Sequence, residues 1–280
     1  MRPRLLLAAL PLLAAAAPVA DNYRVDAPMA RPADARLVWS DEFDGDRLDP
    51  AKWRYDTSRN RDGWYNGEQQ YYAADRPENV RVENGRLIIE ARREALDRAR
   101  YPDWGGQHYT SGRIDTRGHA SWTYGFYEIR AKLPCARGTW PAIWMLPDTG
   151  TWPDGGEIDI MEHVGSQPEV VHATVHSALF VHTRGTQRGA ERPLPGACGA
   201  FHDYQLDWRP DSIAIGVDGR AYMRVTNDRP GGRAAWPFDA PFHLILNLAI
   251  GGSWAAAQGM DDAALPQRME IDYIRVWQRP

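Results

Sequence analysis

The sequence has no long apolar run after residue 17 and no run of basic residues. No later segment approaches the roughly 18 unbroken apolar residues that a membrane-spanning helix requires. Acidic and basic residues are interspersed, and the formal net charge of −4 gives no basic surface for nucleic acid. We therefore expect a soluble mature protein with neither a membrane nor a nucleic acid as its partner.

Several catalytic and metal-binding motifs are also missing. The chain has no Gly-x-Ser-x-Gly elbow, which argues against a serine hydrolase. Its eight histidines are scattered, and neither of its two cysteines has a partner at zinc-ligand spacing. In an oxidising compartment Cys135 and Cys198 would pair, and the long loop so closed would add about 4 kcal/mol of stability in the chain-entropy model. The alternative is two unpaired, buried thiols.

The first residues have the pattern of a secretory signal peptide. Arg2 and Arg4 precede a Leu- and Ala-rich run over residues 5–17, and small residues follow up to Ala20. A buried N-terminal helix is the alternative, which the two leading arginines disfavour. We predict a signal peptide at 1–20, a flexible leader at 21–36 and a single domain at 37–280, in a secreted protein that is extracellular or periplasmic.

The remaining chain alternates short strand-like runs with turn residues, and long helical periodicity is absent. Asn84-Gly85 and Asp218-Gly219 lie between such runs and predict tight hairpin turns. This pattern indicates an all-β fold of two packed antiparallel sheets, either a sandwich or a jelly roll. The predicted strands are 80–82, 86–91, 112–116, 125–133, 142–146, 157–162, 170–176, 204–208, 212–217, 221–225, 243–250 and 269–277.

Tryptophan and tyrosine are abundant, with twelve of each against six phenylalanines. Large aromatic rings with a polar group suit wet binding surfaces, and the flat C–H faces of sugars stack on them. The balance therefore favours a carbohydrate ligand. A core rich in tryptophan is the alternative explanation, and several of these residues must serve there.

Three acids lie within one strand-like run, at Glu157, Asp159 and Glu162. Ile158 and Ile160 would face the core while Glu157 and Asp159 face outward. Glu162 lies five positions after Glu157, so a regular strand would bury its carboxylate at a high free-energy cost. One extra residue, a β-bulge near Met161, returns Glu162 to the outer face.

The bulge sets a testable geometry for the two glutamates. Their Cα atoms would lie about 13 Å apart at roughly 3.3 Å per step, and leaning side chains would bring the carboxyls to about 5–6 Å. That separation is typical of a retaining glycosidase, with Asp159 between the glutamates sharing a proton. An ordinary solvated strand face and a calcium-binding acid cluster are the alternatives.

The segment from Gly156 to Glu162 resembles the signature of glycoside hydrolase family 16. Its bulged form is similar to that of the laminarinase-type endo-β-1,3-glucanases rather than the lichenases. Further segments resemble the family in order along the chain, at 39–45, 66–72, 109–113, 138–146, 247–252 and 272–277. In the segment at 66–72, the family more often has a second Asn or a similar residue before Glu68.

The resemblance implies a jelly-roll sandwich with an open substrate cleft on its concave face. It implies that Glu157 is the nucleophile, Asp159 the assisting residue and Glu162 the acid/base. It also implies contacts to a β-glucan. Asn66 and Arg113 would bind hydroxyl groups, and Trp140 would be a sugar platform in the negative subsites, with Trp144 partly in the core. His176 would face the cleft near the acid/base, and Trp254 would lie at the rim. His176 has a purely structural role as its alternative, and Trp152 either lines the rim or packs in its loop.

The resemblance further implies a structural calcium held by Glu42, the carbonyl of Gly85 and Asp272, with an acidic pair that binds no ion as the alternative. Catalysis itself would need no cofactor. Other functions stay open: hydrolysis or transglycosylation of mixed-linkage glucan, agar or carrageenan, or a non-catalytic glucan-binding lectin. Lectins of this type usually lose a catalytic acid, whereas all three are present here. We expect a monomer.

Overall fold

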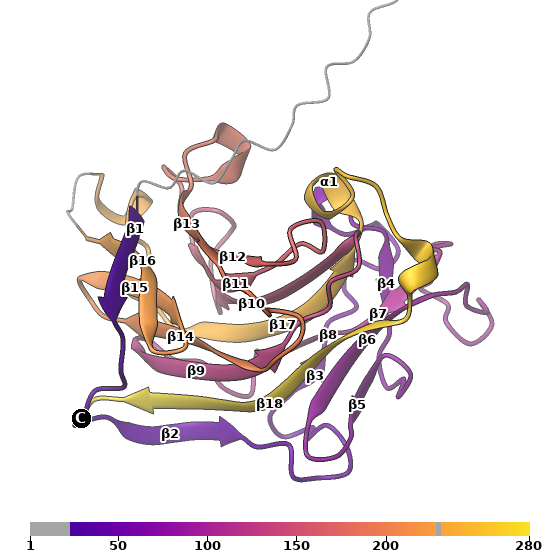
Figure 1. Ribbon diagram of the computed structural model, residues 1–280, viewed down its shortest axis with the longest axis horizontal. Coiled ribbons are helices and arrows are strands. Elements are labelled where there is room, and N and C mark those ends of the chain that lie inside the picture. Colours follow the sequence, from indigo (N-terminus) through magenta and orange to yellow (C-terminus); the bar gives the residue numbers. More distant parts are fainter. Residues whose placement is uncertain (1–22, 228–230) are drawn as a thin grey trace, which may run out of the picture.

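The computed structural model describes residues 23–227 and 231–280, so the predicted signal peptide lies outside the described residues. Two β-sheets make up most of the fold (Figure 1). The predicted sandwich of antiparallel sheets is confirmed, with one parallel pair, β4 (Gln70–Tyr72) beside β7 (Tyr109–Ser111). Within the described ranges, no helix is both long enough and apolar enough to cross a bilayer.

One sheet has eleven strands and contains the two ends of the described chain. Besides β4 and β7 it holds β1 (Arg24–Pro28), β2 (Arg36–Asp41), β5 (Val80–Val82), β6 (Leu87–Arg93), β9 (Gly125–Lys132), β14 (His202–Trp208), β15 (Ser212–Val217), β16 (Arg220–Thr226) and β18 (Gln267–Gln278). The order is β1-β16-β15-β14-β9-β18-β6-β7-β4, with β2 beside β18 and β5 beside β6.

The other sheet has seven strands and carries the predicted acids. Its strands are β3 (Arg54–Tyr55), β8 (Arg113–Asp115), β10 (Thr139–Pro147), β11 (Glu157–Glu162), β12 (Val170–His176), β13 (Arg188–Pro193) and β17 (Phe242–Ile250). The order is β13-β12-β11-β10-β17-β8-β3, so β11 lies between β10 and β12. Short helical segments connect the strands: η2 (Tyr65–Gly67), η3 (His182–Arg184), η4 (Gly232–Ala234), α1 (Gly252–Ala255) and η5 (Asp262–Ala264).

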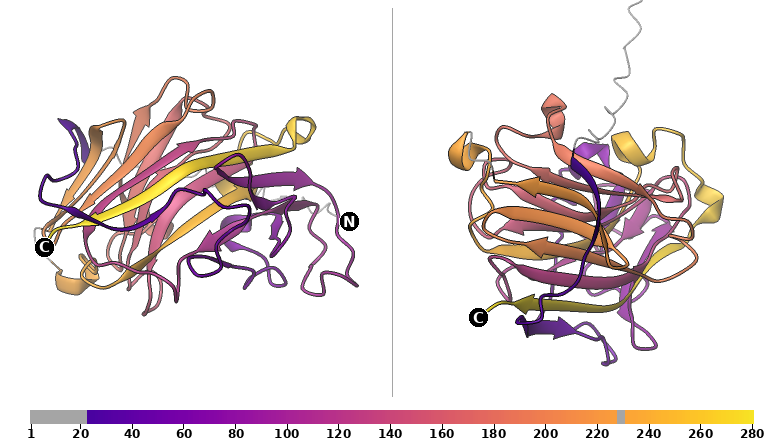
Figure 2. Two further views of the ribbon diagram at one scale, coloured as in Figure 1. Left: turned by 90° about the horizontal axis from the view of Figure 1, so that it is seen from below. Right: turned by 60° about the vertical axis from the view of Figure 1, so that its left-hand side comes forward.

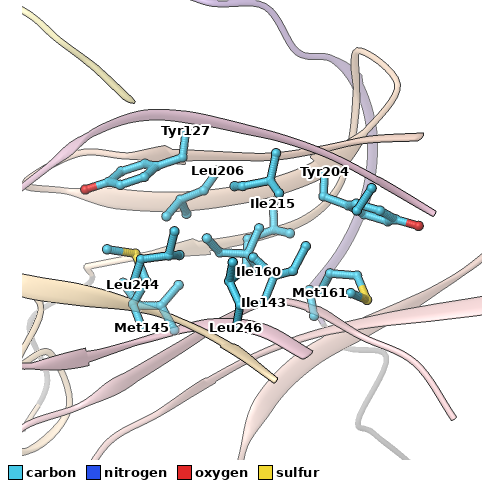
Figure 3. Close-up of a cluster of buried hydrophobic side chains, with 14 of the residues drawn as sticks. Tyr127, Ile143, Met145, Ile160, Met161, Tyr204, Leu206, Ile215, Leu244 and Leu246 are labelled. Carbon is cyan, nitrogen blue, oxygen red and sulfur yellow. The ribbon is translucent and has the colours of Figure 1, made fainter. Parts of the chain in front are cut away.

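A hydrophobic core fills the space between the two sheets. Figure 3 shows Ile143, Met145 and Leu246 of the seven-stranded sheet meeting Leu206 and Ile215 of the other. Each of these side chains is fully shielded from solvent, and burying one aliphatic side chain contributes about 1.5–3 kcal/mol. Because side chains alternate along a strand, the seven-stranded sheet turns its remaining residues to the face away from this core. We call this the outer face.

Both predicted hairpin turns are confirmed. Asn84 and Gly85 have φ angles of 54° and 70°, and Asp218 and Gly219 have 51° and 76°. Positive φ at both central residues is the turn geometry that matches the twist of paired strands. The predicted strands 80–82, 157–162, 170–176 and 212–217 have the observed bounds, and the others agree to within a few residues.

Part of the predicted flexible leader is folded, so that prediction is wrong for residues 24–28 and 36. Strand β1, drawn in indigo in Figure 2, pairs with β16 at one edge of the eleven-stranded sheet, and Arg36 begins β2. The physical reason is burial: Met29 and Ala35 lie in a small apolar cluster with Phe126, Ala221 and Trp277. The sequence pattern missed it because single apolar residues there stand among polar ones.

The predicted disulfide between Cys135 and Cys198 is confirmed. Their Cα atoms lie 5.8 Å apart, within the usual range for a disulfide. Nε2 of His163 lies 3.9 Å from Sγ of Cys135, a neighbour that the spacing along the sequence gave no sign of. Since only a thiolate binds metal strongly, the paired sulfurs do not make this cluster a metal site.

Candidate active site

The predicted β-bulge is present in β11. Along β10, Ile143 pairs with Met161 and the next residue, Trp144, pairs with Asp159, so Ile160 is the extra residue. The ladder to β12 shifts over the same stretch. Ile160 and Met161 are both fully buried, whereas Glu162 is partly exposed. The bulge therefore turns Glu162 to the outer face with Glu157 and Asp159, one residue away from where the sequence predicted it.

The three acids are close enough to influence one another. A carboxylate oxygen of Glu157, one of Asp159 and a ring nitrogen of His176 all lie within 4.8 Å of one another. Burial, with the charge of Asp159 next in size, raises the pKa of Glu157 to about 8. Burial and the charges of Asp159 and Glu157 raise the pKa of Glu162 well above its ordinary value. Carboxylates packed this closely cannot all be ionised, so the group retains protons at neutral pH.

Each carboxylate has a polar neighbour. The indole N–H of Trp140 donates to Oε1 of Glu162 at 3.2 Å, and that of Trp152 donates to Oε2 of Glu157. Nε2 of His176 lies 3.4 Å from Oδ2 of Asp159. The two indole donors are neutral, so they fix the orientation of the two glutamates while leaving each able to exchange a proton. Oδ2 of Asp159 is buried and accepts no hydrogen bond.

His176 lies at a different acid from the one predicted. The sequence placed it near Glu162, but it pairs with Glu157 across the β11–β12 ladder, and His172 is the residue opposite Glu162. Strands β11 and β12 are antiparallel, so the end of β12 meets the start of β11. Burial lowers the pKa of His172 to about 4, so this missed residue is neutral beside the acid/base. Its position directly across from Glu162 could be found only from the strand register.

Trp254 belongs to the group of side chains around Glu162, and its place at the cleft rim stays a prediction. It belongs to α1, and its ring centroid lies 5.2 Å from that of Trp140 and 4.8 Å from that of His172. The backbone of Gly251, just before α1, bridges to Glu68. These contacts bring a segment late in the sequence against the acid/base.

Trp144 and Arg113 lie together on the side of β11 that faces β17 and β8. The Trp144 indole donates to Oδ1 of Asn247 at 2.7 Å, and the Arg113 guanidinium lies 4.8 Å from the Trp144 ring centroid. Arg113 also pairs with Asp56 at 2.9 Å. Trp144 is half-buried, as predicted for a partly core residue. The proposed hydroxyl contacts of Arg113 stay a prediction.

Asn66 lies in η2, with a positive φ of 57°. A Cβ added to Gly252 would lie 3.1 Å from the Asn66 carbonyl oxygen, so α1 packs directly on this turn. Glu68, two residues on, accepts from Gln70 at 3.0 Å, and burial raises its pKa. Its charge also helps to raise the pKa of Glu162. Glu68 is a second missed residue, although it lies in a motif that the sequence analysis quoted.

Comparison with known proteins agrees with this geometry. The profile of Glycosyl hydrolases family 16 matches residues 67–275. The chain belongs to this family. It is 53% identical to a β-glucanase of Rhodothermus marinus over 86% of this chain and 84% of that protein.

Solved structures of the family resemble this enzyme closely. SCLam, a non-specific endo-β-1,3(4)-glucanase, has a TM-score of 0.90 and 54% identity, covering 93% of this chain and 97% of that one. A variant of SCLam co-crystallised with 1,3-β-D-cellotriosyl-glucose has a TM-score of 0.89 and 53% identity, covering 92% and 100%. That variant presents 1,3-β-D-cellobiosyl-glucose at its active site. These matches confirm the jelly-roll fold and identify the protein as a glycoside hydrolase.

The calcium predicted from the family resemblance does not fit the described arrangement. Arg275 donates to both oxygens of Glu42, at 3.0 and 2.8 Å, and Arg130 lies 3.4 Å from Asp272. Glu42 lines a hollow of about 420 Å³, but neither Gly85 nor Asp272 lines it. Guanidinium groups take up the oxygens that a calcium ion would need. The contacts of Glu42 and Asp272 therefore do not support the predicted calcium site.

Proposed function

We propose that the protein is a retaining endo-β-glucanase that hydrolyses laminarin-type β-1,3-glucan and also accepts β-1,3/1,4-glucan. The observation that carries the proposal is the bulge in β11, which turns Glu157, Asp159 and Glu162 to one face. The substrate class is supported by the β-glucanase of Rhodothermus marinus and by SCLam, which is described as acting on both linkages.

The first chemical step breaks the glycosidic bond. The Glu157 carboxylate attacks the anomeric carbon, and the glycosidic oxygen leaves with the proton of Glu162. The raised pKa of Glu162 suits this role, because an acid that keeps its proton at neutral pH can donate it when the bond breaks. The products are a glycosyl ester on Glu157 and a departed chain with a new hydroxyl.

The second step releases the bound glycosyl unit. Glu162, now ionised, takes a proton from water while the water oxygen attacks the anomeric carbon. The ester bond to Glu157 breaks, the product leaves with the β-configuration, and both glutamates return to their starting states. Neither step uses a cofactor.

Asp159 would control when Glu157 is ionised. The charge of Asp159 raises the pKa of Glu157, and burial raises the pKa of Asp159 itself. A proton on Asp159 removes that charge, so Glu157 can ionise and attack. Sharing one proton between the two acids thus prepares the nucleophile without needing a bulk pH change.

Two broader expectations belong with this proposal. The signal-peptide pattern at residues 1–20 supports secretion. Burial and neighbouring charges raise the pKa values of Glu157 and Glu162. This supports an enzyme rather than a glucan-binding lectin, since binding alone has no use for a buried acid cluster that is costly to maintain.

Proton NMR of the purified protein acting on laminarin, with barley mixed-linkage glucan in parallel, tests the proposal. We expect the products to appear first as the β-anomer. The polymer that is hydrolysed faster identifies the preferred linkage. First products as the α-anomer would contradict the double displacement. A folded protein that releases nothing from either polymer would overturn the β-glucanase assignment in favour of a galactan-active enzyme or a lectin.

A further inference from the structure

A histidine at the end of β11 lies against the disulfide. His163 directly follows Glu162, and its side chain is fully shielded from solvent. Its Nε2 lies 3.9 Å from Sγ of Cys135, and its Nδ1 has no hydrogen-bond partner in the described part of the chain. Burying a polar ring without such partners costs free energy. A structural hydrogen bond therefore does not account for this histidine.

The imidazole and the two sulfurs form a compact set of ligand atoms. One nitrogen of His163 and the Sγ atoms of Cys135 and Cys198 all lie within 4.8 Å of one another. The carbonyl oxygen of Pro168 lies 3.6 Å from the first sulfur and 3.3 Å from the second. Two sulfurs, an imidazole nitrogen and an oxygen are a donor set that suits Zn²⁺ in tetrahedral geometry. Only the bond between the sulfurs prevents them from acting as ligands.

Backbone packing holds the three ligand-bearing segments together independently of the disulfide. The Gly165 N–H donates to the Thr139 carbonyl oxygen at 3.0 Å, and a Cβ added to Gly165 would lie 1.8 Å from the Ala136 carbonyl oxygen. The Leu194 N–H donates to the Glu169 carbonyl oxygen at 2.7 Å. Breaking the sulfur–sulfur bond therefore leaves the ligands near one another, which lowers the entropic cost of binding an ion.

The cluster can be reached from solvent. Both cysteines are half-buried, and together with Lys132 and Arg268 they line a hollow of about 480 Å³. This hollow gives a small dithiol, and then a metal ion, a path to the sulfurs. Burial lowers the pKa of His163 to about 4, so at neutral pH its imidazole is neutral and can offer a lone pair to a metal.

We propose that reduction of the disulfide turns Cys135, Cys198 and His163 into a Zn²⁺ site, with an oxygen as the fourth ligand. A dithiol supplies two electrons and two protons: the sulfur–sulfur bond breaks, both cysteines become thiols, and the dithiol becomes a disulfide. Zn²⁺ then displaces the two thiol protons to the buffer and forms two zinc–sulfur bonds and one zinc–nitrogen bond. The ion restores the link between segments that the disulfide made. The site lies outside the proposed glucanase chemistry.

The active site is the competing place for zinc. Glu157, Asp159 and His176 also bring ligand atoms within 4.8 Å of one another. Reduction does not change these ligands, so zinc bound there would appear in oxidised and reduced protein alike. Zinc at the proposed site would appear only after reduction. Co²⁺ is a direct marker, because thiolate ligands give it an intense charge-transfer band that carboxylates and imidazoles do not.

The test compares the oxidised protein with protein reduced by dithiothreitol and then freed of it under nitrogen. By equilibrium dialysis, the reduced protein should bind one Zn²⁺ more than the oxidised protein, and Co²⁺ should give the thiolate band in the reduced protein alone. Zinc at about a hundredfold above its Kd should raise the thermal midpoint of the reduced protein by about 5 °C or more. The oxidised protein should show a smaller rise or none.

Matched variants assign the ligands. Reduced His163→Ala should bind this zinc about a hundredfold more weakly, since loss of a ligand costs at least as much as loss of a ligand's hydrogen-bond partner. The double variant Cys135→Ser/Cys198→Ser should bind no further zinc after reduction and give no thiolate band with Co²⁺. His119→Ala is the control, because His119 is an exposed histidine, and it should bind as the wild type does.

Two results would overturn the site. One is an equal number of zinc ions on reduced and oxidised wild-type protein. The other is a reduced His163→Ala variant that binds zinc as tightly as the reduced wild type. If His163→Ala does not fold, reduced Cys198→Ala decides, because it keeps the histidine and loses one sulfur. Its zinc should also bind about a hundredfold more weakly, and wild-type affinity in this variant would overturn the proposal.

Discussion

The indole nitrogen of Trp140 lies 3.2 Å from Oε1 of Glu162. This hydrogen bond favours the ionised carboxylate, so it lowers the pKa of Glu162 against the larger effect of burial. Trp140 was predicted only as a sugar platform. Its contact gives it a second role, in setting how firmly the acid/base holds its proton.

Trp140→Phe should therefore move the alkaline limb of the pH profile of kcat/KM to higher pH. The aromatic ring remains, but the donor is lost and the pKa of Glu162 rises further. Trp144→Phe is the control, because the Trp144 indole donates to Asn247 instead. An unchanged alkaline limb in Trp140→Phe, measured on laminarin, would contradict the contact.

Glu157→Gln and Glu162→Gln should each lower kcat by about a thousandfold or more, since each removes a group that forms or breaks a bond. Neither should unfold the protein, because an amide of nearly the same shape replaces a carboxyl whose ionisation burial already disfavours. Kinetics on laminarin and thermal unfolding test both statements. Glu191→Gln, at a half-exposed carboxylate of β13, should retain near-normal turnover. A folded Glu157→Gln enzyme with wild-type rates would refute the assignment.

Asp159→Asn should lower kcat by less, by about ten- to a hundredfold. It should also move the acidic limb of kcat/KM to lower pH, because the charge of Asp159 is one cause of the raised pKa of Glu157. The acidic limb reports the ionisation of the nucleophile in the free enzyme. A limb that stays in place or moves to higher pH would show that Asp159 does not act on Glu157 through its charge.

The stability of the protein should depend on Glu157 in a defined pH window. Its pKa is raised from 4.5 to about 8 on folding, so between these values the folded chain holds a proton that the unfolded chain has lost. The stability linked to this group is present below pH 4.5 and decreases as the pH rises to about 8. The thermal midpoint of Glu157→Gln should therefore exceed that of wild type by more at pH 8 than at pH 5. A difference independent of pH would exclude this linkage.

The central strands and the bulge could be predicted from the sequence because each depends on a local pattern. Buried strands such as 212–217 are continuous apolar runs bounded by turn residues. The bulge follows from the odd spacing of Glu157 and Glu162 in a strand whose other residues must face the core. The free-energy cost of burying the Glu162 carboxylate predicts the bulge without knowledge of the neighbouring strands.

What the sequence missed depends on how distant segments meet. Strand β13 has the polar sequence Arg188–Pro193, and only pairing with β12 makes it a strand. Likewise, the register of the antiparallel strands β11 and β12 places His172, rather than the predicted His176, beside Glu162. Neither residue carries a local signal of its partner, so only the three-dimensional pairing distinguishes them.

Strand β1 has a consequence for how the protein can be shortened. Residues 24–28 lie along the β16 edge of the eleven-stranded sheet, and this part of the chain comes just after the predicted cleavage site. Removing the residues before 37, the predicted start of the domain, would leave main-chain N–H and C=O groups of β16 open to solvent. An open edge of this kind invites a strand from another molecule. A protein shortened in this way would lose the strand that covers the β16 edge and would be prone to self-association.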